Sequence, residues 1–228
     1  DAHEVAHLHV GQIVAERLVL RLGGGDGLLV DDGIAHIAHL LLRLVQHVED
    51  LLFLDGARLG SALTSPESDL TLPELAALTD VFTIGGTKNG AMFGEALVIT
   101  RPELTDGFFR MKKRMGAVME KGWIQGVMFQ ALFTDDLYFH MARHANEMAF
   151  RLRDGFLALG YQFPVPSPSN QQFPVMKVRT AEKLAAMGFE FQVERPIDEE
   201  HTMYRFVTSW ATPESAVDDL LNALAQCQ

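Results

Sequence analysis

The stretch Thr83-Ile84-Gly85-Gly86-Thr87-Lys88-Asn89-Gly90 closes a short apolar run that starts after Asp80. Residues 81–84 are β-branched or aromatic, which predicts a strand, and the two glycines free the backbone to turn where that strand ends. Lys88 is therefore expected at the mouth of a sheet, where open α/β sheets bind ligands. An amine shielded from water there can lose its proton near neutral pH and condense with an aldehyde. The alternative is an ordinary loop lysine.

A second polar residue follows an apolar run about thirty residues upstream. Leu51–Leu54 reads as a buried strand that leads directly into Asp55, with Arg58 one turn later. An unpaired buried carboxylate is costly, so Asp55 needs a cationic or hydrogen-bonding partner. Arg58 could be that partner for structural reasons alone. Asp55 could instead hold a protonated pyridine nitrogen, which keeps pyridoxal phosphate electron-withdrawing.

The amino-acid sequences of several segments resemble those of one enzyme family. These segments are Leu54–Leu59, Thr83–Gly90, Gly94–Val98, Lys113–Met119 and Arg205–Thr212, in that order. Together they resemble the low-specificity L-threonine aldolases, in the β-eliminating lyase superfamily of pyridoxal-phosphate enzymes with the aspartate-aminotransferase fold. The resemblance covers residues 51–228 and does not extend to residues 1–50.

The resemblance implies a role for each of five side chains. Lys88 would be the catalytic lysine that binds pyridoxal 5'-phosphate covalently, and Asp55 would pair with the pyridine nitrogen. Arg205 would clamp the substrate α-carboxylate through its planar guanidinium, and Arg58 would lie near the cofactor and the same carboxylate. Lys113 is a weaker candidate for a contact to the cofactor phosphate. No metal is implied.

The strand pattern around Arg205 supports its placement in a site. Alternation over residues 204–210 puts Arg205 on the opposite face from Tyr204 and Phe206. The structural alternative is that Arg205 serves as a partner for Glu194 or Asp198.

Residues 1–50 have an unusual composition. They contain no Lys, Ser, Thr, Pro, Asn, Phe, Met, Tyr, Trp or Cys, yet six of the nine histidines lie there. Such usage is improbable for a natural domain, so we interpret this segment as a frameshift or gene-model artefact in place of the family's own residues. The family's phosphate-binding loop and ring-stacking imidazole then have no matching position. We also expect the segment to pack poorly and to leave strand Leu51–Leu54 or its neighbours with an unprotected edge or an exposed apolar face.

Two other patterns in this segment allow alternative interpretations. The spacing of His3, His7 and His9, with His36 and His39 further on, could form a metal site, although a misread segment is the favoured interpretation. The run Gly23–Gly27 lacks the lysine and hydroxyl of a P-loop and the spacing of a dinucleotide fingerprint.

Overall composition narrows the class of protein. The formal net charge of −11 argues against nucleic acid or an anionic membrane as a partner. The single cysteine, Cys227, forms no intrachain disulfide and predicts a reducing compartment. No run is long enough to span a membrane and no signal sequence is recognisable at the start, so a cytoplasmic location is expected.

The fold class predicted is α/β, with a truncated large domain of the pyridoxal-phosphate fold type I, built on a mainly parallel sheet, and a smaller C-terminal α+β domain. The predicted division is residues 1–50 as the unmatched segment, 51–134 as the large domain and 135–228 as the small domain. A long amphipathic helix is expected over residues 135–159, ended by Gly160. Residues 212–215 are expected to cap a last helix.

The reaction implied by the resemblance is cleavage of L-threonine or a related β-hydroxy-α-amino acid to glycine and an aldehyde. Alternatives are another β-eliminating lyase of the superfamily, or an inactive truncated fragment. The fold type also implies a homodimer or homotetramer, with closed symmetry. The methionine- and aromatic-rich residues 108–133 are expected to supply apolar surface for that contact.

Overall fold

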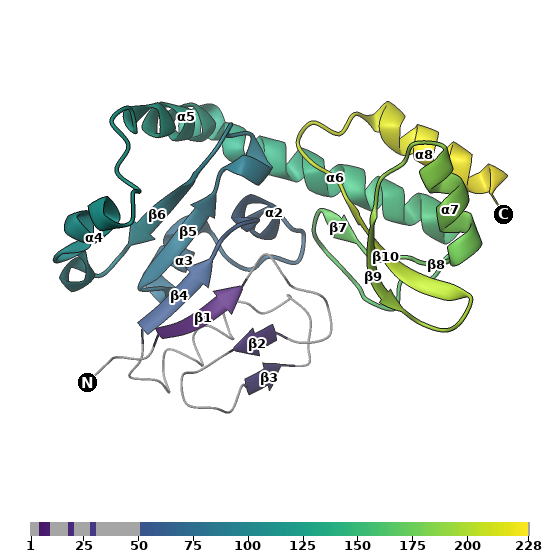
Figure 1. Ribbon diagram of the computed structural model, residues 1–228, viewed down its shortest axis with the longest axis horizontal. Coiled ribbons are helices and arrows are strands. Elements are labelled where there is room, and N and C mark those ends of the chain that lie inside the picture. The colour runs from purple at the N-terminus through teal and green to yellow at the C-terminus, as the bar shows by residue number, and fades with distance from the viewer. Residues whose placement is uncertain (1–4, 10–17, 21–27, 31–50, 228) are drawn as a thin grey trace. The chain divides into compact units, whose positions relative to one another are not determined.

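The computed structural model describes residues 5–9, 18–20, 28–30 and 51–227, and the side chains of residues 51–227 (Figure 1). This part of the chain divides into two compact units. One contains residues up to 63 and residues 67–140, and the other contains residues 64–66 and 141–228. The division after residue 140 falls within helix α6 (Leu137–Ala158).

The first unit is built on a four-stranded sheet with the order β1-β4-β5-β6. Its strands are β1 (Val5–His9), β4 (Leu51–Asp55), β5 (Val81–Gly85) and β6 (Glu95–Ile99). β4 pairs in parallel with β1 and β5, whereas β6 runs antiparallel to β5. The sheet is therefore mainly parallel, as predicted. A separate antiparallel pair joins β2 (Leu18–Leu20) and β3 (Leu28–Val30).

The edge of β4 is covered, whereas the expectation that its neighbours keep an unprotected edge, or that an apolar face is exposed, stays a prediction. All five residues of β1 pair with β4, from Val5 opposite Leu51 to His9 opposite Asp55, so this edge of β4 is covered. The physical reason is that a strand with free amides and carbonyls accepts a neighbouring extended segment whatever its side chains are. The side chains of residues 1–50, including the histidines and the glycine run considered above, lie outside the described residues.

Local signals explain the helix that joins β4 and β5. After the short helix α2 (Leu59–Leu63), helix α3 (Leu72–Leu78) begins with Thr71 as N-cap. Thr71 Oγ1 accepts from the Glu74 amide at 3.4 Å, and the Glu74 carboxylate accepts from the Thr71 amide at 2.8 Å. This reciprocal pair is a capping box, and it satisfies two amides at the helix start. Burial of Leu52, Leu54 and Phe82 then fixes the strands in the core.

The region after β6 is broken into short helices, not one long one. It comprises the 3₁₀ turn η4 (Pro102–Thr105), α4 (Phe108–Arg114), α5 (Trp123–Phe133) and the 3₁₀ turn η5 (Thr134–Asp136). Gly116, with a φ of +71°, lies between α4 and α5 in a conformation that favours glycine. Many apolar side chains of this region are exposed; they are Phe109, Met111, Met115, Val118, Met119, Trp123, Ile124, Val127 and Phe133.

The second unit packs helices against an antiparallel sheet. β10 (His201–Val207) pairs with β7 (Gln171–Gln172), β8 (Val175–Lys177) and β9 (Gln192–Pro196). The helices are the later part of α6, α7 (Val178–Ala186) and α8 (Glu214–Gln226). Gly160 follows α6 with a φ of +85°, as expected for a residue that ends a helix.

The core of this unit gathers aromatic and aliphatic residues from all three helices. Phe156 of α6 is fully buried, and its ring meets those of Tyr161 and Phe206 at centroid distances of 5.3 Å. Leu184 of α7 and Leu224 of α8 belong to the same buried cluster. The predicted capping of the last helix differs in detail, because Pro213 is the N-cap and no side chain caps the helix. The Thr212 hydroxyl instead accepts from the Ser209 amide at 2.9 Å.

Candidate active site

The carboxyl ends of β4 and β5 lie next to each other, because the two strands are parallel neighbours. Phe53 pairs with Val81 and Leu54 with Phe82, so the last residue of β4, Asp55, lies beside Thr83. The Gly56 amide donates to Thr83 Oγ1 at 2.8 Å. The sequence prediction that Asp55 and Lys88 follow neighbouring strand ends is confirmed by this pairing.

Glycine is required where the two strand ends meet. The Gly85 amide donates to the Gly56 carbonyl at 3.0 Å, which draws the two backbones together. A Cβ atom on Gly85 would lie 2.5 Å from the Ala57 carbonyl oxygen, and one on Gly56 would overlap the Thr83 carbonyl oxygen. Both clashes are with backbone, which cannot move aside as a flexible side chain can. The glycines therefore permit the close approach of the Asp55 and Lys88 segments.

Lys88 lies in a single 3₁₀ turn directly after β5. This turn, η3 (Thr87–Asn89), ends at Gly90 with a φ of +102°. Lys88 is exposed, whereas the adjacent Asn89 is buried, and the Asn89 side-chain amide donates to the Tyr138 carbonyl at 2.7 Å. Within residues 51–227, no hydrogen bond or ion pair holds the Lys88 ammonium. The turn is thus fixed by its buried neighbour, while the lysine side chain is left available to react.

A buried phenol ties the Asp55 segment to the Lys88 segment. Tyr138 is 1% exposed; its hydroxyl accepts from the Gly60 amide at 3.1 Å and donates to the Gly85 carbonyl at 3.1 Å. Its ring stacks on Phe133 at a centroid distance of 5.1 Å. Burial raises the pKa of Tyr138 well above its ordinary value, so the hydroxyl stays protonated and keeps its donor. Sequence reasoning missed this residue, because nothing local marks one aromatic of a helix as a link between two distant loops.

Asp55 and Arg58 occupy the loop that leaves β4. Both are half-buried, and Asp55 Oδ1 accepts from the Ala57 amide at 3.1 Å, which fixes the carboxylate over its own turn. No ion pair joins Asp55 to Lys88 among the residues that the structure describes. A salt bridge between these two side chains therefore does not prevent a planar group from lying between them.

Arg205 lies on β10 of the second unit and contacts two residues of β9. Its Nη2 donates to Gln192 Oε1, and its Nε lies 3.8 Å from Glu194 Oε2. That distance is within reach of an ion pair but too long for a hydrogen bond, and Nε is buried without a hydrogen-bond partner in the described part of the chain. The alternative considered above, in which Arg205 is a structural partner of Glu194 or Asp198, is therefore correct for Glu194. It is wrong for Asp198, which is hydrogen-bonded to His201. Lys88 and Arg205 belong to different units, so their sharing one cleft stays a prediction.

The remaining candidate, Lys113, is an exposed residue of α4. It lies in the same unit as Lys88, and the structure gives it no contact that points to a phosphate group. In residues 51–227 no cluster of histidine, cysteine, aspartate or glutamate could hold a metal ion. No helix of the described chain is long and apolar enough to cross a membrane.

Two known proteins of similar sequence are low-specificity L-threonine aldolases. No protein-family model matches the chain. A low-specificity L-threonine aldolase of Pseudomonas sp. (strain NCIMB 10558) is 30% identical over 178 residues, covering 74% of this chain and 48% of that protein. The Pseudomonas aeruginosa enzyme of the same name is 29% identical over 170 residues with the same coverage. This chain matches threonine aldolases. It spans about half the length of these curated relatives.

Solved structures give the same result for the fold. The threonine aldolase of Leishmania major is 34% identical with a TM-score of 0.84, over 98% of this chain and 60% of that one. The aspartate aminotransferase of Thermus thermophilus shares 16% identity with a TM-score of 0.60, over 99% and 57%. The predicted fold, that of the aspartate-aminotransferase type, is confirmed, and the chain covers 60% and 57% of these two structures. The predicted resemblance to threonine aldolases is confirmed over part of their length.

Proposed function

We propose that this chain carries part of a pyridoxal-phosphate-dependent aldolase that cleaves L-threonine or related β-hydroxy-α-amino acids to glycine and an aldehyde. The observation that carries the proposal is the pairing of β4 with β5, which brings Asp55 and the Lys88 turn to neighbouring strand ends. Similarity to threonine aldolases from Pseudomonas and Leishmania, at 30% and 34% identity, supports the same assignment.

The groups present fit the chemistry of the cofactor. Pyridoxal phosphate needs an amine for its aldehyde and an anion for its ring nitrogen, and Lys88 and Asp55 are such groups at adjacent strand ends. When bound, the cofactor withdraws the electron pair left on the substrate Cα as the Cα–Cβ bond breaks. Asp55 would accept a hydrogen bond from the ring nitrogen and keep it protonated. Lys88 would hold the cofactor through Nζ, and Lys113 is the weaker candidate for the phosphate.

Arginine orients the substrate in this proposal. Arg205 and Arg58 would bind the α-carboxylate and so hold the substrate in a fixed orientation. The buried Nε of Arg205, without a hydrogen-bond acceptor in the described chain, supports this role, because a buried guanidinium nitrogen is stabilised by an acceptor. A carboxylate oxygen bound there would satisfy it, together with a second guanidinium nitrogen in the usual forked geometry.

The working assembly that we propose is a homodimer or homotetramer in the cytoplasm. The support is the exposed apolar surface of α4 and α5 in this unit, where Met115 is 79% exposed and Trp123 is 67% exposed. Exposed apolar area of this kind marks a contact surface on a soluble protein. The single cysteine, Cys227, fits a reducing compartment.

A spectrum and a product assay test the proposal. Incubation of the chain with pyridoxal phosphate should give an absorption band near the visible edge, and Lys88→Ala should abolish it. Lys121→Ala, which removes an exposed lysine of the same unit outside the site, should keep the band. With L-threonine the loaded chain should release acetaldehyde and glycine.

Three other outcomes would contradict the proposal in different ways. Release of a keto acid from threonine would identify a β-eliminating lyase. Absence of the band from the unchanged chain would identify an inactive fragment. Retention of the band in Lys88→Ala would show that another residue binds the cofactor.

A further inference from the structure

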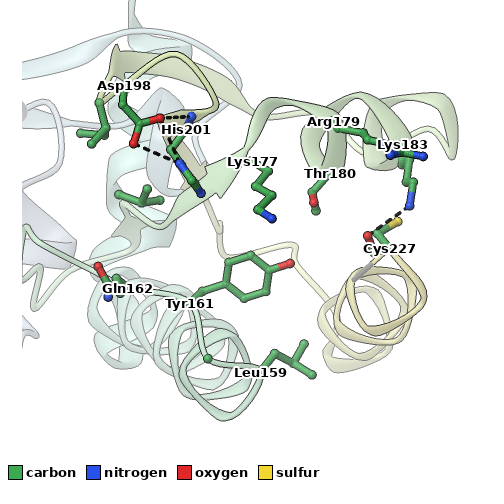
Figure 2. A pocket seen from close by; sticks show the side chains of 13 residues that line it. Leu159, Tyr161, Gln162, Lys177, Arg179, Thr180, Lys183, Asp198, His201 and Cys227 are labelled. Atoms are coloured by element: carbon green, nitrogen blue, oxygen red, sulfur yellow. Dashed lines mark hydrogen bonds and ion pairs between the residues drawn. The ribbon is translucent and has the colours of Figure 1, made fainter.

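The second unit contains a cavity that the proposed function does not use. Its volume is about 790 Å³, and it is bounded by the end of α6, strand β8, the first turns of α7, the β9–β10 turn and the end of α8 (Figure 2). Tyr161 stands in the cavity, and its hydroxyl is directed toward the side that carries Thr180 and Cys227. None of the candidate active-site residues lines this space.

Cationic side chains dominate the polar lining of the cavity. Lys177, Arg179 and Lys183 line it, and Asp198 is the one side-chain carboxylate among the described residues that line it. Asp198 is already occupied: its Oδ1 accepts from the amides of Glu200 and His201 at 2.8 Å each. The hydrogen bonds that these two amides donate lower the pKa of Asp198, and the one from Glu200 has the largest effect. The Asp198 carboxylate therefore stays ionised. Its charge is thus directed to its own turn and to the His201 ring.

Two of the cations have no structural task in the described chain. Lys183 Nζ donates to the Cys227 carbonyl at 3.2 Å, at the end of α8, where a cation is favourable for the helix. The side chains of Lys177 and Arg179, by contrast, make no hydrogen bond or ion pair within residues 51–227. In a chain with a formal net charge of −11, three cations around one cavity would repel each other, and an anion between them would relieve that repulsion.

The backbone adds to the same field. Lys177 is the N-cap of α7, a nine-residue helix; the Val178 amide donates to the Glu200 carbonyl at 2.9 Å, and no side chain caps the amides of the first turn. These amides carry the positive end of the helix dipole. Thr180, one turn into α7, is buried at the cavity and lies three residues before Lys183, which places the two on one helix face. The residues that line this one space therefore carry a hydroxyl, a guanidinium and two ammonium groups.

We propose that this cavity binds a small molecule bearing a phosphate group, with its apolar part against the Tyr161 ring. The donor set fits a phosphate, because a guanidinium binds two of its oxygens together while lysines act as point charges. Leu159 and Val175 supply the apolar wall beside Tyr161. The proposal is independent of aldolase activity, since all the lining residues belong to the second unit.

Calorimetric titration of the whole chain with inorganic phosphate tests this proposal. Single-site binding is expected, weakening as salt is added because the charges are partly exposed. Lys177→Gln combined with Arg179→Gln should weaken binding about tenfold or more, the loss expected for charge-assisted hydrogen bonds. The matched control, Arg114→Gln with Lys121→Gln, removes the same charge from exposed positions of the first unit and should leave phosphate affinity unchanged.

Specificity and location give two further readouts. Acetate at equal ionic strength should bind more weakly than phosphate, and Lys88→Ala should bind phosphate like the unchanged chain. The proposal is overturned if the unchanged chain binds no phosphate, if acetate binds equally well, or if the control variant loses as much affinity as the Lys177 and Arg179 variant. Loss of phosphate binding in Lys88→Ala would also overturn it, by assigning the phosphate to the other unit.

Discussion

Replacing Tyr138 by phenylalanine isolates the contribution of one buried hydroxyl to the candidate active site. The substitution removes one bond from the Gly60 amide and one to the Gly85 carbonyl, both 3.1 Å long. The ring stays in place against Phe133, so packing is nearly unchanged. Because Tyr138 is 1% exposed, water cannot replace the hydroxyl, and the Gly60 amide and the Gly85 carbonyl each lose the bond to it.

The expected magnitude follows from the number of hydrogen bonds lost. Each buried group that loses its bond to the hydroxyl costs about 1–3 kcal/mol, so the free energy of unfolding should fall by about 2–6 kcal/mol. For a chain of this length that corresponds to a fall in melting temperature of roughly 4–24 °C. Urea unfolding followed by circular dichroism measures the change, provided the slope with denaturant stays constant.

Tyr204→Phe is the matched control for this experiment. It removes the same atom from a buried tyrosine of the second unit, where the hydroxyl bonds to the Thr202 side chain. One hydrogen bond is lost in place of two, so the expected loss is about 0.5–1.5 kcal/mol. If Tyr138→Phe costs no more than this control, the hydroxyl does not link the two loops, and the structural argument is wrong.

Two further predictions concern ionisation and substrate binding. Burial raises the pKa of Tyr138 above its ordinary value of 10.0. The stability that the neutral hydroxyl contributes is therefore fully present below pH 10.0 and is lost as the pH rises toward the folded-state pKa. Above that pH the free energy of unfolding, measured with urea, should fall less steeply in Tyr138→Phe than in the unchanged chain, and an equally steep fall would contradict the assignment. Arg205→Lys keeps the charge but loses the forked geometry, so threonine binding to the cofactor-loaded chain should weaken by about 2–5 kcal/mol. An unchanged half-saturation in a spectral titration would remove Arg205 from the substrate site.

The sequence by itself determined the elements that carry the candidate site. Short apolar runs ending in Asp55 and in Gly85-Gly86 specify two strands and their ends, because strand formation and glycine turns depend on neighbouring residues. The order and the amino-acid sequences of these and later segments also predicted the similarity to threonine aldolases and hence the fold. The two faces of β10 followed from alternation alone: Tyr204 and Phe206 are buried, whereas Arg205 is more exposed.

Only the tertiary structure decided which distant groups meet. Tyr138 reaches Gly85 across 53 positions and Gly60 across 78 positions of the chain, and no local pattern records a contact of that range. The cavity of the second unit is likewise lined by residues that are far apart in the sequence. Its cationic side chains come together only when the second unit has folded. The pairing of β1 with β4 was missed for the same reason: strands pair through backbone groups, whose hydrogen bonds do not depend on side-chain composition.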